Sequence, residues 1–509
     1  MNLNKKTQTP LTPPSMIENL MTATRRRFLV ATAVILPWLA SGQVLSAVTT
    51  NPARPNIIVI VADDLGYGDV SCLVRKVVAT PNIDRLAKSG VTFTSGYATC
   101  PLCAPSRVGF LTGRYNQRAG AEHNTSVPAI PNDVPIISEF FKQAGYATGL
   151  LGKWHPGSNK PGQRPFDRGF TEFYGYYSPF LNYREPKIFR LDQLVAEKEY
   201  STDAFAREAE HFIEKHRNAP FFLNVAFNAP HITCTSKDSV SGKKMLKENP
   251  ADFKREQKSG KFKEVMSRVG EDQKFLQQFG NEWARADTVA CITALDQAVG
   301  RILDKLQKTG LDRNTIVFFF SDNGGHPENR SENLPLNGYK WSVNEGGMRV
   351  PFLAAYPAVF PAGLTYSKPV MTFDILPTCA ALAGVKTPDH LDGVNLTPYL
   401  IGQETTAPHD ALYWRITMPG QAPLRAMRKG PWKLLMAKNT SPQLFEIDKD
   451  CEEKYDVAAK HPEVVAELKQ AWETWSASVG EPKDNTMPQA VVAPVAADPA
   501  KRNCYGAKK

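Results

Sequence analysis

Two short apolar runs, each followed at once by acidic or amide side chains, constrain the fold of this chain most strongly. Residues 56–62 have the sequence N-I-I-V-I-V-A and precede Asp63 and Asp64, and residues 314–321 (N-T-I-V-F-F-F-S) precede Asp322 and Asn323. Short runs rich in β-branched and aromatic residues predict strands that are buried on both faces, as in parallel sheets. Because ligands gather beyond the carboxyl ends of such strands, we expect these four polar residues to lie together.

The segments around these strands predict an α/β fold. Residues 220–226 form a third apolar run, while residues 83–90 and 275–309 have helical periodicity and are followed or closed by glycine. Alternating buried strands and helices indicate a large, mainly parallel sheet sandwiched by helices, whose core strands are expected to end near Phe352.

A smaller unit is expected downstream. Short strand-like pieces at 412–415, 432–435 and 443–447 precede a helical segment at 462–475, which predicts a small antiparallel sheet with a packed helix. We therefore expect an α/β domain over residues 48–390 and a C-terminal α+β subdomain over residues 391–480. The Lys-, Glu- and Ser-rich residues 236–271 are expected to form an insertion, and residues 481–509 a disordered tail.

The paired carboxylates predict a metal site. Adjacent like charges repel, and burying them is costly unless a cation compensates them. Three carboxylates and one amide oxygen form a hard oxygen ligand set, which suits Ca²⁺, or alternatively Mg²⁺, better than zinc. Either pair alone could equally be a helix cap or a solvated turn, and the shared strand-end position of both pairs favours the metal.

The N-terminus predicts export. Arg25, Arg26 and Arg27 precede Phe28 and Leu29 in a twin-arginine pattern, an apolar run extends to residue 39, and residues 45–47 (L-S-A) form a possible cleavage site. Residues 1–47 are therefore expected to be a signal segment of a bacterial periplasmic or secreted protein. The run is short for a bilayer span, so no stable membrane span is expected after cleavage, an uncleaved anchor being the alternative.

Composition limits the partners. The 509 residues carry a formal net charge of +10, which suits an anionic substrate but equally a generic basic protein. No basic run is interleaved with aromatic residues, so we expect no nucleic acid partner. The eight cysteines leave disulfide pairing open.

One motif indicates the chemistry. Cys103-Ala104-Pro105-Ser106-Arg107 is followed, after three residues, by L-T-G-R at residues 111–114. This pattern resembles the signature of the Cys-type, formylglycine-dependent sulfatases, which are arylsulfatase-like members of the alkaline phosphatase superfamily. The resemblance implies an alkaline-phosphatase-like fold and oxidation of Cys103 to formylglycine by a maturation enzyme. Cys100 and Cys103 also form a C-x-x-C pair, but no second such pair supports a redox or zinc site.

Three further segments match the family in order. Gly152-Lys153-Trp154-His155 resembles its G-K-W-H element, although Pro156 stands where leucine is common. Residues 228–231 (N-A-P-H) resemble a segment that carries a substrate-contacting His231. Lys340 lies five residues before Glu345 of E-G-G-M-R-V-P, which matches the element whose lysine binds sulfate. The resemblance implies catalytic roles for Cys103, Arg107, Lys153, His155, His231 and Lys340, and one calcium on Asp63, Asp64, Asp322 and Asn323.

The implied reaction is hydrolysis of a sulfate ester. The formylglycine hydrate would attack sulfur and form a covalent sulfo-enzyme, with Lys153 and Lys340 stabilising sulfate oxygens and Arg107 holding the formylglycine. His231 would protonate the departing alcohol, and His155 would help to release sulfate. Export and basicity favour a sulfated polysaccharide or oligosaccharide as substrate. A phosphatase or phosphodiesterase of the same superfamily and a non-catalytic sulfoglycan-binding protein are the alternatives.

A few further residues are open candidates. Ser178 is a candidate polar site residue. His123 and His326 could border the pocket or lie on the surface. Trp414 and Arg415 could reach the site from the C-terminal part and select substrate.

Overall fold

A mixed sheet of ten strands forms the centre of the computed structural model, which describes residues 54–74, 78–124, 130–232, 282–417 and 422–482. The strand order is β11-β2-β10-β9-β1-β8-β4-β5-β6-β7. The strands are β1 (Asn56–Ala62), β2 (Val91–Phe93), β4 (Ala147–Lys153), β5 (Glu172–Tyr176), β6 (Lys187–Arg190), β7 (Gln193–Ala196), β8 (Phe221–Ala226), β9 (Thr315–Ser321), β10 (Phe352–Ala355) and β11 (Leu364–Tyr366).

The five central strands, β9-β1-β8-β4-β5, are parallel to one another. Every residue of β1, β8 and β9 is buried. Alternate residues of β1 enter two separate cores: Ile58 and Ile60 pack on one face of the sheet, and Ile57 and Val59 pack on the other. This two-sided burial explains why these strands are apolar throughout rather than alternating.

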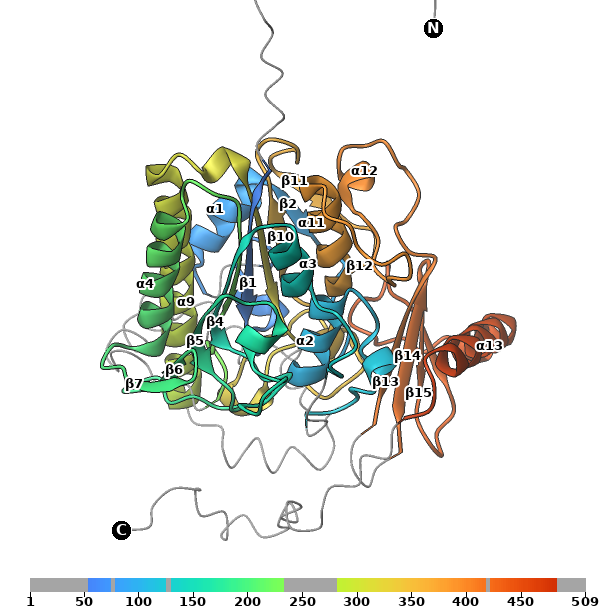
Figure 1. Ribbon diagram of the computed structural model, residues 1–509. Coiled ribbons are helices and arrows are strands. Elements are labelled where there is room, and N and C mark those ends of the chain that lie inside the picture. The colour runs from blue at the N-terminus through green and yellow to red at the C-terminus, as the bar shows by residue number, and fades with distance from the viewer. Residues whose placement is uncertain (1–53, 75–77, 125–129, 233–281, 418–421, 483–509) are drawn as a thin grey trace, which may run out of the picture. The chain divides into compact units, whose positions relative to one another are not determined.

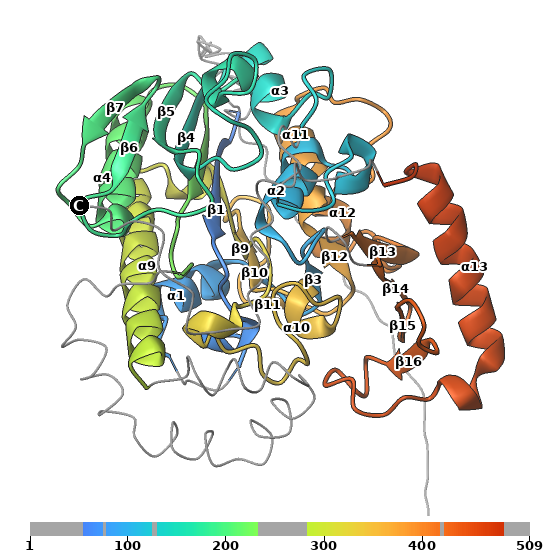
Figure 2. The same ribbon diagram turned by 90° about the horizontal axis from the view of Figure 1, so that it is seen from below.

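Helices cover both faces of the sheet (Figure 1). One face carries α1 (Pro81–Ser89), α4 (Ser201–Lys215) and α9 (Glu282–Lys308), and the other carries α2 (Cys103–Thr112), α3 (Ile137–Gln143) and α11 (Ile375–Ala383). Figure 2, a view along the strands, shows the two layers on either side of β1. The predicted α/β fold with a mainly parallel sheet is confirmed.

The expectation that the core strands end near Phe352 is wrong. β10 begins at Phe352 and pairs antiparallel with β9 and with β2, and β11 follows beside β2. These strands have four and three residues, too few to show a period in the sequence. Other short elements include α10 (Glu345–Met348), α12 (Thr397–Leu400) and the paired β3 (Gly96–Tyr97) and β12 (Val370–Met371).

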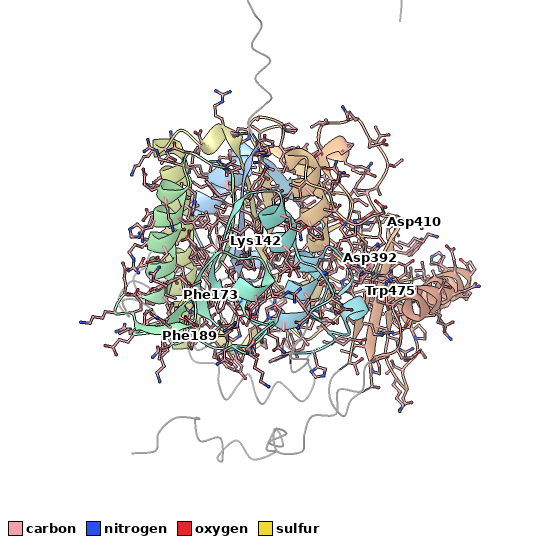
Figure 3. All side chains as sticks on the ribbon, viewed as in Figure 1. Lys142, Phe173, Phe189, Asp392, Asp410 and Trp475 are labelled. Atoms are coloured by element: carbon pink, nitrogen blue, oxygen red, sulfur yellow. The ribbon has the colours of Figure 1, made fainter. Side chains whose placement is uncertain are left out.

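A four-stranded antiparallel sheet follows, as predicted. It consists of β13 (Ala411–Ile416), β14 (Leu424–Lys429), β15 (Trp432–Met436) and β16 (Gln443–Glu446), with α13 (Pro462–Ser478) alongside. Three of the strands match predicted pieces, and β14 was missing from the prediction. Trp475, labelled in Figure 3, stacks on Tyr413 of β13 with ring centroids 5.1 Å apart and therefore lies where helix and sheet meet.

A buried ionic cluster joins this small sheet to the rest of the protein. Lys433 Nζ of β15 lies 2.8 Å from Glu345 Oε1 and 2.9 Å from Glu453 Oε1, and all three side chains are fully buried. The Tyr97 hydroxyl donates to Glu345 Oε2 over 2.8 Å, and Arg428 donates to the Tyr97 hydroxyl. We call Glu345, Glu453, Lys433, Arg428 and Tyr97 the docking cluster.

Some expectations lie outside the described residues. They are the signal segment at 1–47, the insertion at 236–271 and, apart from residues 481 and 482, the C-terminal tail. Among the helices of the described ranges, none combines the length and apolar character that crossing a membrane requires.

Candidate active site

The four strand-end residues lie together, as the sequence predicted. β1 and β9 are neighbours with Ala62 paired to Ser321, so the residues that follow them leave the same edge of the sheet. The Asp64 backbone N–H donates to Asp322 Oδ1 over 3.2 Å, and Asn323 Nδ2 donates to Asp64 Oδ1 over 2.7 Å. Asp63, Asp64, Asp322 and Asn323 are all fully buried.

Cys103 is the first residue of α2. Leu102 before it is extended, and Pro105 is tolerated in the first helical turn because the backbone N–H groups there have no partner within the helix. The Cys103 Sγ lies 3.1 Å from Lys340 Nζ and 3.9 Å from Asp64 Oδ1. Burial raises the pKa of the Cys103 thiol to about 12, although Lys153 and Lys340 oppose the rise. An unmodified thiol at this position would therefore stay protonated near neutral pH.

Three cations are paired with the three carboxylates. Lys153 Nζ lies 2.7 Å from Asp63 Oδ2, and Lys340 Nζ lies 2.7 and 2.9 Å from the two oxygens of Asp64. Arg107 Nε donates to Asp322 Oδ2 over 3.0 Å, and Arg107 Nη2 lies 2.8 Å from the same oxygen. We call Asp63, Asp64, Asp322, Arg107, Lys153 and Lys340 the active-site cluster.

The pKa values of these carboxyls diverge. Burial opposes ionisation of Asp63 and Asp64, but Lys153 next to Asp63 and Lys340 next to Asp64 outweigh it and lower both pKa values. Burial and the negative charge of Asp63 instead raise the pKa of Asp322 to about 7, more than Arg107 can offset. The ionised form of Asp322 is therefore less well stabilised than those of Asp63 and Asp64.

The local backbone conformation determines the positions of Lys153 and His155. Lys153 ends β4, and a side chain at the preceding Gly152 would approach the Ala226 carbonyl oxygen to 1.9 Å, so only glycine allows this close pairing. His155 adopts a left-handed backbone conformation with φ 62°. Its Nδ1 is buried without a hydrogen-bond partner among the described residues. Burial and the charge of Lys153 hold the pKa of His155 well below its usual range.

His231 approaches from the segment after β8. Its Nε2 lies 3.5 Å from Asp64 Oδ2, and its Nδ1 contacts the carbonyl oxygen of Ile232. Burial lowers the pKa of His231 to about 4 despite the nearby Asp63 and Asp64. Both site imidazoles are therefore neutral near pH 7 and can accept a proton.

The residues at the strand ends fit a divalent cation. Asp63 Oδ1 and Asn323 Oδ1 are buried and have no hydrogen-bond partner among the described residues. One ligand atom each of Asp63, Asp64, Cys103 and His231 lies within 4.8 Å of the others, with Asp322 and Asn323 bonded to Asp64 beside them. A divalent cation would stabilise the ionised form of Asp322 and give the open oxygens a partner.

The open candidates Ser178, His123 and His326 differ in how exposed they are. The Ser178 side chain is exposed and accepts a hydrogen bond from the Phe180 N–H over 3.1 Å. His123 and His326 are buried rather than on the surface, and His326 packs on Trp341 with ring centroids 4.6 Å apart.

Trp414 and Arg415 are buried in contacts between the small sheet and the core. Trp414 Nε1 donates to the Ala98 carbonyl oxygen over 2.9 Å, and Arg415 Nη2 lies 2.7 Å from Glu122 Oε1. These contacts hold the C-terminal sheet in place and leave both side chains almost without solvent exposure, so the structure does not support substrate selection by them.

Two residues near the site were missing from the sequence-based set. Tyr176 ends β5, and its buried hydroxyl has no hydrogen-bond partner within the described ranges. Burial and Asp63 raise its pKa. Phe180 lies beside His231, with ring centroids 5.2 Å apart. Tyr176 could have been found from its position at a strand end, whereas no sequence pattern marks Phe180.

Comparison with known families agrees with this geometry. Residues 55–385 match the family described as Sulfatase, and residues 339–477 match the family described as N-sulphoglucosamine sulphohydrolase, C-terminal. The chain is 30% identical over 408 residues to the N-acetylgalactosamine-6-sulfatase of Rattus norvegicus, covering 73% of this chain and 70% of that protein. It is 28% identical over 462 residues to arylsulfatase D of Homo sapiens, covering 72% and 71%.

A solved structure is similar over most of its length. The crystal structure of Ps i-CgsB superposes with a TM-score of 0.73 at 34% identity, covering 84% of this chain and 94% of that one. The same protein has also been solved in complex with k-i-k-neocarrahexaose.

Proposed function

The chain belongs to the sulfatase family and is a sulfuric ester hydrolase, and from this premise we propose that it is an exported, calcium-dependent enzyme acting on a sulfated polysaccharide or oligosaccharide. One observation carries the proposal. Cys103 opens α2 beside Lys340 and Asp64, next to two buried oxygens that have no partner in the described part of the chain. A nucleophile, a cation and a ligand set for a metal therefore share one buried site.

The nucleophile is proposed to be formylglycine made from Cys103 by a maturation enzyme. The raised pKa of the thiol supports this, because a protonated thiol is a poor nucleophile. Oxidation to the aldehyde would supply a hydrate hydroxyl for attack on sulfur. Arg107, from the same helix, would hold this end of α2 against Asp322.

The metal is proposed to be Ca²⁺ rather than Mg²⁺, held by Asp63, Asp64, Asp322 and Asn323. When bound, it would stabilise negative charge and lower the pKa of a nearby hydroxyl. In the active-site cluster three cations already balance three carboxylates, so a divalent ion would leave the site positive. A net positive site favours a sulfate monoester, which is an anion.

The remaining residues are assigned by what they can do. Lys153 and Lys340 each carry a buried positive charge that can stabilise sulfate oxygens. His155, neutral and with an open Nδ1, can accept a proton. His231 can protonate the departing alcohol once the negative charge of a bound sulfate favours its protonated form.

The proposal also includes the domain organisation and the cellular location of the protein. Residues 1–47 would direct twin-arginine export, and the bacterial protein would act in the periplasm or outside the cell. Residues 48–390 would form the catalytic domain and residues 391–480 the C-terminal subdomain. A sulfated sugar substrate is supported by the oligosaccharide named for the similar Ps i-CgsB structure.

The test uses full-length protein produced together with a formylglycine-generating enzyme. Release of inorganic sulfate is measured from 4-nitrophenyl sulfate, k-i-k-neocarrahexaose, D-glucosamine-2-N,6-O-disulfate and N-acetylgalactosamine-6-sulfate, with 4-nitrophenyl phosphate as the competing substrate. We expect sulfate release from at least one sugar, loss of this activity on calcium chelation and its recovery when calcium is restored. Faster hydrolysis of the phosphate ester, or no sulfate release from any sugar, would contradict the proposal.

A further inference from the structure

Phe180 is a large apolar side chain that the fold leaves in solvent. Its side chain is 54% exposed, one of five large hydrophobic residues with substantial exposure in the described ranges. Among those five, Phe180 has an aromatic contact with a residue of the site, namely the edge-to-face contact with His231 at 5.2 Å. An exposed aromatic ring next to a buried catalytic group needs a functional explanation more than a ring exposed elsewhere.

The exposure of Phe180 does not come from a detached segment. The next residue, Leu181, is packed against the core, and Tyr183 is 1% exposed. The Tyr183 hydroxyl donates to the carbonyl oxygens of Asn228 and His231 over 2.8 and 3.0 Å. The segment that carries Phe180 is therefore fastened to the segment that carries His231, which keeps the two rings together.

Asp64, His231 and Phe180 form a series that runs from the buried metal-binding residues to the solvent. Asp64 is fully buried, His231 is 5% exposed with Nε2 directed at Asp64, and Phe180 is mostly in solvent. His231 is the residue proposed to protonate the departing alcohol. A side chain that touches His231 on its solvent side therefore faces the part of the substrate that carries this oxygen.

We propose that Phe180 is a sugar-binding residue on the leaving-group side of the site, where its ring stacks on the apolar face of a pyranose. This inference rests on the proposed function of the site. An aromatic ring has only two side-chain torsions to order, and it offers the C–H face of a sugar a large apolar surface. The inner part of the site would bind the sulfate group, and Phe180 would select for a sugar attached to it.

The test compares Phe180→Ala and Phe180→Trp with the wild type on the sugar of the panel that the wild type desulfates fastest. We expect Phe180→Ala to raise KM for that sugar roughly tenfold with little change in kcat, as expected for loss of one stacking contact. Phe180→Trp should restore KM. The inhibition constant of inorganic sulfate, which occupies only the inner part of the site, should be unchanged in both variants.

Ile401→Ala is the matched control. Ile401 is 38% exposed and follows α12, at the opposite end of the sheet from the carboxyl end of β1 (Figure 1). Removing this exposed apolar side chain should leave KM unchanged.

Two results would overturn the inference while the proposed function stands. One is an unchanged KM in Phe180→Ala. The other is an equal fall in kcat for the sugar and for 4-nitrophenyl sulfate, which would mean that Phe180 only supports His231. A wild-type protein that releases no sulfate from any sugar would instead remove the proposed function, and the inference with it.

Discussion

The docking cluster and the active-site cluster are both buried, and they differ in whether every carboxylate oxygen has a cation or a hydrogen-bond donor beside it. In the docking cluster, Lys433 lies between Glu345 and Glu453, and Tyr97 and Arg428 extend the network. In the active-site cluster the cations also match the carboxylates, yet Asp63 Oδ1 and the neighbouring Asn323 Oδ1 have no hydrogen-bond partner in the described part of the chain.

This difference indicates that the docking cluster stabilises the fold and that the active-site cluster carries the chemistry. A paired buried cluster resists change, because removing one partner leaves an uncompensated charge. A cluster with an open carboxylate oxygen has capacity left for a ligand. Substitutions in the docking cluster should therefore lower stability, and substitutions in the active-site cluster should mainly lower activity.

The largest effect is expected at Cys103. Cys103→Ala removes the side chain from which the nucleophile is made, so turnover should fall roughly 10⁶-fold or to background. Cys100→Ala is the matched control, because Cys100 is equally buried three residues earlier but packs in the apolar core. Sulfate release by the two variants is compared at equal concentrations of folded protein. Comparable activity in both would contradict the account.

The next effect concerns the docking cluster. Lys433→Met removes the lysine that Glu345 and Glu453 share and should lower the free energy of unfolding by about 3–5 kcal/mol. Urea unfolding measures the loss, and kcat of the remaining folded enzyme should change little. A large loss of kcat with unchanged stability in Lys433→Met would contradict the assignment of the docking cluster to stability alone.

Lys340→Met tests the active-site cluster in the same way. Lys340 is expected to stabilise sulfate oxygens, so its loss should lower kcat about 10²–10³-fold. Measured with calcium present, stability should fall less than in Lys433→Met, because the metal still compensates Asp64. The comparison fails if Lys340→Met unfolds the protein as readily as Lys433→Met.

Calcium should stabilise the wild type and not a ligand variant. At calcium about 100 times its Kd, binding contributes about 2.7 kcal/mol to stability. Thermal unfolding with and without calcium should show this gain in the wild type and little of it in Asp63→Asn. Glu139→Gln, which alters a carboxylate paired with Arg168 away from the site, should keep the full gain. A similar gain in both variants would exclude Asp63 as a ligand.

The smallest effect is expected at the buried pair of His409 and Asp374. Burial opposes protonation of His409, but Asp374, 2.9 Å from its Nε2, outweighs it and raises the pKa of His409. A raised pKa means that the pair stabilises the fold below the unfolded pKa of about 6.5, and that this contribution disappears as pH rises through the folded pKa. His409→Gln should therefore lose stability at acidic pH and much less at alkaline pH, as urea unfolding at both would show. An equal loss at both would contradict the assignment.

Sequence reasoning succeeded where one strong local signal decides the structure. The bounds predicted for β1 are those observed, and β8, β9 and α13 differ by only a few residues, because continuous apolar runs or a clear helical period mark them. The strand-end residues met because parallel strands end at one edge of a sheet.

It failed where distant partners decide the structure. β14 contains Arg425 and Arg428, which interrupt its apolar pattern, and Arg428 is buried because Tyr97 and Asp448 accept its hydrogen bonds. The docking cluster likewise has no local signature, since Glu345, Lys433 and Glu453 come from separate segments. The contact between Phe180 and His231 joins two loops that no sequence period connects.

The chemical state of Cys103 shows most directly whether the nucleophile is formylglycine. Protein made with the maturation enzyme is alkylated under reducing conditions and digested with trypsin, and the peptide of residues 89–107 is analysed by mass spectrometry. It contains Cys100 and Cys103, so Cys100 serves as an internal control. In active protein we expect one alkylated thiol, at Cys100, and an aldehyde or its hydrate at position 103. Two alkylated thiols in protein that still releases sulfate would contradict this expectation.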